Sequence, residues 1–183
     1  MIQNISPITW YGYWTKLNMK KYILLLFLTN LSFSYSQINP KDVEIVRDSF
    51  GVPHIYGKTD ADVAYGLAWS HAEDDFKTIQ QGYLAGNGLL SKHIGINGAG
   101  ADFLTQLIES KETVDKLFGT LDPDFVKIIE AYSQGLNKYA ETHPNEILEK
   151  KLFPITPKKM TAYSFLQLFI ANEADKLVLS IIN

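Results

Sequence analysis

The sequence predicts a helix-rich α+β domain that opens with a β-hairpin. Two short alternating runs, Val43–Arg47 and Val52–Tyr56, flank a turn that contains Gly51, which is the pattern of a hairpin. Three later segments repeat their apolar residues with the period of a helix and outweigh the strand signals. With 183 residues, 46% of them apolar and 20% charged, the chain has enough apolar residues for a core. Its length suits one domain or a piece of a larger one.

The first 36 residues have the layout of a targeting segment. Residues 19–36 contain two lysines, then an apolar run from Tyr22 to Leu28, then Ser34 and Ser36 before Gln37. This three-part order is typical of a secretory signal peptide, and its apolar run is short for a membrane span. The alternative is a buried or anchoring helix. We therefore expect residues 1–18 to precede the true start, residues 37–183 to be the mature chain, and that chain to be periplasmic or secreted with no membrane segment.

Charge and cysteine content exclude several classes of partner. Residues 1–36 hold three of the 17 basic residues and none of the 20 acidic ones, so residues 37–183 carry a net charge of −6. An acidic domain is poorly suited to nucleic acid, whose phosphates need basic surface. Because the sequence has no cysteine, it has no disulfide framework, no cysteine lipidation and no thiolate metal site.

The predicted hairpin and the helix after it form the first half of the domain. Pro53 lacks an N–H donor and suits the start or edge of its strand. Thr59 or Asp60 caps a helix whose apolar face comprises Val63, Leu67, Ala68, Ala72, Phe76, Ile79 and Tyr83. Gly66 in mid-helix indicates close approach of another element. Gly82, Gly86 and Gly88 end the helix.

The middle of the chain predicts a loop and two helices. The glycine-rich stretch Lys92–Phe103 has no period and is expected to be a loop. A helix from Asp102 would bury Leu104, Leu107, Ile108, Val114, Leu117 and Phe118. Asp122 as cap and Pro123 at the first position begin a third helix, which Pro144 stops. Its buried stripe would be Phe125, Ile128, Ile129, Tyr132, Leu136 and Tyr139.

The last segment predicts a core helix from about Thr161, preceded by a linker with two prolines. Its apolar residues, Leu166, Phe169, Ile170, Leu177 and Ile181, lie on more than one side. No Gly, Pro or basic turn stops this helix before Asn183, so we expect the sequence to be incomplete.

A search for reactive arrangements finds no complete active site. The sequence has no G-x-S-x-G motif, its four histidines are scattered, and the glycines at 95, 98 and 100 do not follow a strand. Within "HAEDD" we interpret Glu73 and Asp75 as solvated. The residues alone thus predict an exported helical domain without a catalytic centre.

Three motifs in order closely resemble the start of the penicillin amidase (penicillin acylase) family, whose members are N-terminal nucleophile hydrolases and include acyl-homoserine lactone acylases. The resemblance covers roughly residues 43–180. The family's R-D-x-x-G-[VIM]-P-H-I hairpin is matched by Arg47, Asp48, Gly51, Val52, Pro53, His54 and Ile55. Its Tyr-Gly…Ala-[QE]-Asp helix is matched by Tyr65, Gly66, Ala72, Glu73 and Asp74. Its Y-x-x-G-[LM]-N helix is matched by Tyr132, Gly135, Leu136 and Asn137. Asp75 departs from the Arg or Asn that the family often has there.

The resemblance implies the N-terminal α-chain part of an αββα fold, truncated before its catalytic Ser. Such precursors are cleaved into an α chain and a β chain. The Ser that begins the β chain is the nucleophile, and its own amine, with a pKa of about 8, is the base. No catalytic residue is therefore expected here. We interpret His54 as a structural hydrogen-bonding residue and Asp74 as a link between helix and sheet.

Substrate and cofactor residues follow from the same resemblance. Glu173 and Leu177 align with α-chain residues of the substrate pocket, and plain core is the alternative for Leu177. Asn183 falls near the position of a Glu that holds Ca²⁺ in the family. No metal ligand or cofactor is therefore expected in this chain, and Ca²⁺ is left to the full-length enzyme. The expected partners are the β chain of the same precursor and a small acyl-amide substrate.

The leading hypothesis for function is an exported acylase that hydrolyses a non-peptide amide bond, such as that of a penicillin or an acyl-homoserine lactone. The alternatives are an inactive truncated remnant and a non-catalytic exported helical module. Leu177 and Val178 are aliphatic, and no aromatic residue lies between Phe169 and Asn183. We therefore expect aliphatic acyl groups rather than aromatic ones. Alone, the chain would be inactive, because the nucleophile, the base and the oxyanion donors would all be absent. It would also be poorly stable, because its last helix would expose Leu166, Phe169, Ile170 and Leu177.

Overall fold

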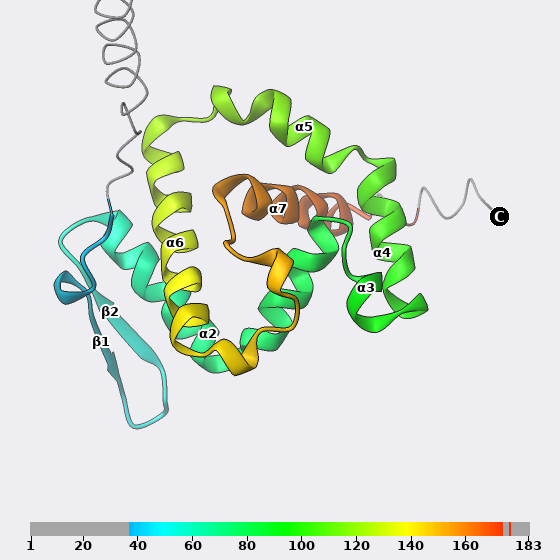
Figure 1. The fold of residues 1–183 in the computed structure, drawn as a ribbon. Coiled ribbons are helices and arrows are strands. Elements are labelled where there is room, and N and C mark those ends of the chain that lie inside the picture. The colour runs from blue at the N-terminus through cyan, green and yellow to red at the C-terminus, as the bar shows by residue number, and fades with distance from the viewer. Residues whose placement is uncertain (1–36, 174–175, 177–183) are drawn as a thin grey trace, which may run out of the picture. The chain divides into compact units, whose positions relative to one another are not determined.

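The structure, a computed structural model, describes residues 37–173 and 176. The chain divides into two compact units, residues 1–36 and 37–183. The expected signal peptide and the segment before it lie outside the described residues. The elements of the second unit are, in order, η1 Pro40–Asp42, β1 Glu44–Arg47, β2 Pro53–Tyr56, α2 Asp60–Gly86, α3 Ser91–Ile94, α4 Ile96–Leu107, α5 Ser110–Leu117, η2 Phe118–Thr120, α6 Pro123–Thr142, η3 Pro144–Glu146, η4 Lys150–Leu152 and α7 Pro157–Ala171 (Figure 1).

The predicted hairpin is confirmed. Strands β1 and β2 pair antiparallel, with Arg47 opposite Pro53 at the turn end, so Pro53 opens its strand as expected. In the turn, the Asp48 carboxylate accepts the backbone N–H of Phe50 at 2.8 Å. Gly51 has φ +83°, a conformation that costs glycine little. The local turn residues therefore suffice to specify this element.

Helix α2 begins as predicted but is kinked. The Thr59 side chain accepts the Asp62 N–H and Asp62 bonds back to the Thr59 N–H, which completes a capping box. At Asp75 the backbone leaves the helical region, with φ −159° and ψ 73°. The Asp75 carboxylate then accepts the N–H of Thr78 at 3.0 Å and caps the second half of the helix. Hydrogen bonds from the side chain and from the backbone N–H of Thr78 lower the pKa of Asp75. This exposed carboxylate therefore serves as a helix cap.

The buried face of α2 includes the predicted Ala68, Ala72, Phe76 and Tyr83 but not the predicted Val63 and Leu67. Val63 and Leu67 are 37% exposed, whereas Ala68 is fully buried. A Cβ on Gly135 would clash with the Tyr65 carbonyl oxygen, so α6 crosses α2 at backbone distance there. Figure 1 shows the two helices side by side. Small residues such as Ala68 thus allow the close helix contact in this half of α2.

The predicted loop at Lys92–Phe103 is wrong, because α3 and most of α4 occupy it. Its glycines allow close packing: a Cβ on Gly98 would lie 2.6 Å from the Ser91 nitrogen. Buried Asp102 accepts the N–H groups of Leu90 and Ser91, each at 2.8 Å, and so caps α3. The helix expected from Asp102 onward is broken at Glu109, whose φ is +48°. It forms α4 and α5 instead of one helix.

Helix α6 and the core match the prediction more closely. Asp122 accepts the N–H groups of the first turn, Pro123 opens the helix and Pro144 follows its end. Phe125 is 51% exposed, so the buried stripe begins only at Ile129. The core joins α2 and α6 to the segment before α7 through residues that include Ala72, Phe76, Leu84, Leu136, Tyr139, Leu152 and Ile155.

Helix α7 begins at Pro157, four residues before the expected Thr161, because Thr156 caps it and its proline sits in the first turn. Only Ala162 and Leu166 of this helix are buried, while Leu168 and Ile170 are 64% and 43% exposed. The predicted exposure of Leu166 is therefore wrong, whereas Ile170 is exposed as expected. In the described part of the chain, no helix is both long and apolar enough to cross a membrane.

Candidate functional site

One cluster of charged residues joins the hairpin to α2. The Arg47 guanidinium contacts Asp74 at 2.8 Å and Glu73 at 3.2 Å, and it donates to the Gly51 carbonyl at 2.8 Å. The bond to Glu73 raises the pKa of Arg47 above its usual value. Trp69 Nε1 donates to the other Glu73 oxygen at 2.8 Å. Asp74 thus links helix and sheet as predicted, whereas Glu73 is paired rather than only solvated.

His54 lies in the hairpin, beside Asp48. Its Nε2 lies 3.4 Å from Asp48, and half of its side chain is exposed. The pKa of Asp48 is lowered, first by the backbone N–H groups of Val52 and Phe50 and less by His54. Asp48 therefore organises the turn and His54 is an outer partner, which fits the structural role predicted for it.

The third motif holds three elements together. Gly135 allows α6 to contact α2, and Leu136 is fully buried. Asn137 donates to the Ile155 carbonyl at 2.8 Å and accepts its N–H at 2.7 Å, as a neighbouring strand would. The Tyr132 hydroxyl bonds Nδ1 of His71 at 2.8 Å, and burial raises the pKa of Tyr132 to about 12. These motif residues build the framework and leave no reactive group free.

Side chains from α2 and α7 hydrogen-bond to the backbone of residues 144–155. Gln80, fully buried in α2, donates to the Glu146 carbonyl at 3.0 Å. Lys159 of α7 donates to the carbonyls of Leu152 at 2.6 Å and Pro154 at 3.0 Å, and burial lowers its pKa. Neither Gln80 nor Lys159 was predicted from the sequence. For Gln80, its place among the apolar positions of α2 could have indicated a buried hydrogen-bonding role.

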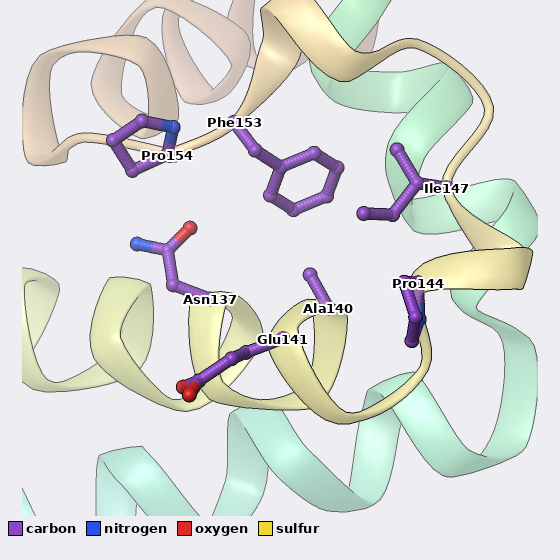
Figure 2. A pocket seen from close by; sticks show the side chains of 7 residues that line it. All are labelled: Asn137, Ala140, Glu141, Pro144, Ile147, Phe153 and Pro154. Atoms are coloured by element: carbon purple, nitrogen blue, oxygen red, sulfur yellow. The ribbon is translucent and has the colours of Figure 1, made fainter.

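This segment and the end of α6 line a shallow hollow of about 390 Å³ that is open to solvent. Figure 2 shows Phe153 and Ile147 facing Ala140 across it, with Asn137 beside Pro154. The side-chain amide of Asn137 is already hydrogen-bonded to the backbone of Ile155. Glu141 at its rim bonds Lys138 at 2.9 Å. The walls of the hollow are mostly apolar, and its polar side chains, Asn137 and Glu141, are both engaged in hydrogen bonds.

Of the two predicted substrate residues, the structure describes only Glu173. Glu173 lies two residues beyond the end of α7 with φ +58°, and its 71%-exposed side chain bonds Lys176 at 2.7 Å. Leu177 lies outside the described residues. Glu173 does not line the hollow. Among residues 37–173 and 176 no group of three or more His, Asp or Glu could hold a metal ion.

Comparison with known proteins decides the family. The model of the penicillin amidase family matches residues 42–177. The chain belongs to the penicillin amidase family. Penicillin G acylase of Escherichia coli is 23% identical over 140 residues, which are 74% of this chain and 16% of that protein. Acyl-homoserine lactone acylase PvdQ of Pseudomonas savastanoi pv. phaseolicola is 24% identical over 103 residues, which are 52% of this chain and 13% of that protein.

The fold agrees with this membership. A solved structure of thermostable penicillin G acylase from Alcaligenes faecalis, in its tetragonal form, superposes with a TM-score of 0.59 at 20% identity. The match covers 69% of this chain and 72% of that one. The helix-rich α+β architecture is therefore that of this acylase family. The chain spans about a sixth of the length of the penicillin G acylase that it matches.

Proposed function

We propose that this chain is the N-terminal portion of an exported acylase that hydrolyses a non-peptide amide bond. The observation that carries the proposal is the family match over residues 42–177, which includes all three motifs. The matched relatives are named as penicillin and acyl-homoserine lactone acylases, and both are amide hydrolases. The proposed substrate class is accordingly a small acyl amide of one of these kinds.

In this proposal the reacting groups lie beyond the present sequence. An N-terminal Ser attacks the acyl carbonyl carbon while its own α-amine takes the hydroxyl proton. The amine product leaves with that proton, and water then hydrolyses the acyl ester. The described residues supply the frame: the Arg47 cluster fixes the hairpin, and Asn137 fixes the segment before α7. The β chain of the same precursor is the proposed partner, and Ca²⁺ is proposed only for the full-length enzyme.

The proposed acyl group is aliphatic. The support is the sequence around Leu177 and Val178, which offers aliphatic and no aromatic side chains. An aliphatic wall gains about 0.8 kcal/mol for each CH₂ group that it buries, so it favours longer chains. The names of the relatives include both penicillin and homoserine lactone acylases, so the relatives leave this choice to experiment.

The test is to express the whole gene with its export signal and assay the purified periplasmic protein. We expect release of free acid from an octanoyl or dodecanoyl amide, with a higher kcat/KM than for the phenylacetyl amide. Mass spectrometry should find the α chain beginning near Gln37, and the 183-residue chain alone should release no acid. A purified, folded full-length protein that cleaves none of these amides would contradict the proposal and favour the inactive remnant. A preference for phenylacetyl would overturn only the acyl-group assignment.

A further inference from the structure

Two Asn-Gly pairs lie near each other in the sequence, Asn87-Gly88 and Asn97-Gly98. An asparagine before a glycine is prone to deamidation, because glycine has no side chain to shield its backbone nitrogen. In this reaction the deprotonated glycine nitrogen attacks Cγ of the asparagine, a C–N bond forms, and the side-chain amide nitrogen leaves as ammonia. Water then opens the cyclic imide to aspartate or isoaspartate. Since the two pairs have the same local sequence, a difference in their reactivity comes from the fold.

The side chain of Asn87 is held by carbonyl groups of two helices. Asn87 follows the end of α2, and its Nδ2 donates to the Tyr83 carbonyl at 2.8 Å and to the Lys159 carbonyl of α7 at 3.1 Å. Its backbone N–H also donates to the Tyr83 carbonyl, at 3.1 Å. Attack on Cγ requires this side chain to turn away from both carbonyls. The two bonds from Nδ2 therefore oppose deamidation at Asn87.

The backbone around Asn87 is packed as well. Gly86 is buried, and a Cβ there would clash with Cα of Tyr163 in α7. The N–H of Leu89 donates at 2.8 Å to the carbonyl of Leu84, which is fully buried. A backbone movement at this end of α2 would separate α2 from α7. Segments open rarely where opening disrupts buried contacts, so the packing protects Asn87 further.

Asn97 has a different environment, in the first turn of α4. Its side chain is exposed and has no hydrogen-bond partner among residues 37–173 and 176. Ile96 is 86% exposed, and a Cβ on Gly95 would meet nothing within 4 Å. The N–H of Gly98 belongs to the group of first-turn donors that lack an α-helical partner, and it bonds the Gly95 carbonyl at 3.0 Å. A movement of residues 95–97 therefore exposes little buried surface.

Gly98 itself is kept in place by α3, which lies beside α4 (Figure 1). A Cβ on Gly98 would lie 2.6 Å from the backbone nitrogen of Ser91. One turn later, Asp102 accepts the N–H groups of Leu90 and Ser91, each at 2.8 Å. The rotation that brings Cγ of Asn97 to the Gly98 nitrogen thus falls on residues 95–97, which are all exposed. The attacking nitrogen is fixed, whereas the amide that it attacks is free to turn.

We propose that Asn97 is a site of spontaneous deamidation in this protein and that Asn87, in spite of the same Asn-Gly sequence, is protected by the contact between α2 and α7. The reaction needs no reactant other than water. The aspartate product carries its carboxylate in the first turn of α4, where the positive end of the helix stabilises a negative charge. This product is therefore compatible with the fold, and it accumulates as the protein ages.

Storage of the purified full-length protein in warm, mildly alkaline buffer tests the proposal. Trypsin cleaves after Lys92, so Asn87 and Asn97 fall in separate peptides whose deamidation is followed by mass spectrometry. We expect Asn97 to be converted at least about ten-fold faster than Asn87 in native buffer, and the two rates to agree within about two-fold in urea. Asn97→Gln is the matched control, because glutamine would have to form a larger ring, and it should abolish conversion of that peptide.

The outcomes in native buffer are decisive. Faster conversion at Asn97 upholds the proposal. Equal rates, faster conversion at Asn87, or an unchanged Asn97 over a period in which urea converts both residues would overturn it.

Substitutions that mimic the product give a second readout. Asn87→Asp replaces a double donor with a carboxylate that faces two carbonyl oxygens at the negative end of α2. It should lower the urea midpoint of unfolding by about 1 M, whereas Asn97→Asp should leave the midpoint within about 0.2 M of its original value. Equal losses in the two variants would contradict the protective role of the Asn87 contacts.

Discussion

The closest contact between the two main helices offers a sharp test of the packing. Gly135 of α6 faces α2, and an added Cβ would clash with the Tyr65 carbonyl oxygen and lie 2.8 Å from Cβ of Ala68. Neither group can rotate away, because one is backbone and the other is the first atom of its side chain. The Gly135→Ala substitution must therefore push the two helices apart.

The magnitude follows from two opposing effects. Alanine gains up to about 1 kcal/mol over glycine in a helix interior. Overpacking a core contact costs about 1–3 kcal/mol, and a clash with backbone belongs at the upper end. We expect Gly135→Ala to lower the free energy of unfolding by about 2 kcal/mol. Gly100 in α4 is the matched control, since its Cβ would meet nothing within 4 Å. There the same substitution should raise stability by about 0.5–1 kcal/mol.

Urea unfolding followed by circular dichroism at the helix band measures both variants. With a slope of about 2 kcal/mol per molar urea, Gly135→Ala should shift the midpoint down by about 1 M, while Gly100→Ala should shift it slightly up. If Gly135→Ala were as stable as the unsubstituted protein, the close crossing of α2 and α6 would be wrong. A loss of stability in Gly100→Ala would instead show that the higher helix propensity of alanine does not determine stability at this position of α4.

Three further substitutions test single groups by the same unfolding assay. Asn137→Ala leaves the buried backbone of Ile155 without two partners and should cost about 2–3 kcal/mol; a loss below 0.5 kcal/mol would contradict this. The hydroxyl of Ser70 is buried without a partner in the described part of the chain, so Ser70→Ala should be neutral or stabilise by up to about 1 kcal/mol. Burial raises the pKa of Tyr132 from about 10 to about 12, so its folded form holds the proton longer and stability should fall between pH 10 and 12. Tyr132→Phe removes the hydroxyl and its bond to His71, so stability should fall less between pH 10 and 12. An unchanged dependence of stability on pH would refute the assignment of this fall to Tyr132.

Elements that depend on local chemistry were predictable from the sequence. The hairpin turn at Gly51, the capping of α2 by Thr59 and the opening of α6 at Pro123 all rest on residues within a few positions of one another. Close approach at Gly66 was also predicted, although its partner was not named. In each case one residue type has few conformational or steric alternatives.

Elements that depend on distant partners were not predictable in the same way. The stretch at residues 92–103 looked like a loop because glycine is flexible, yet Gly98 is needed for contact with the backbone at Ser91. The kink at Asp75 and the exposure of Val63 are not encoded in the apolar periodicity of α2. The hollow at Phe153 likewise requires Asn137 and its partners to meet in space.

The motifs that resemble the family are all joints between elements. Arg47 and Gly66 join the hairpin to α2, Gly135 joins α6 to α2, and Asn137 joins α6 to the segment before α7. Each joint depends on one chemical feature: the guanidinium of Arg47, the absence of a side chain at Gly66 and Gly135, or the amide of Asn137. Substitution at these positions therefore costs more stability than at ordinary surface positions. At 20–24% identity the family is therefore recognisable from residues that hold the frame rather than from residues that react. A frame of this kind can keep its geometry while the pocket attached to it changes, which fits relatives that are named for different acyl amides.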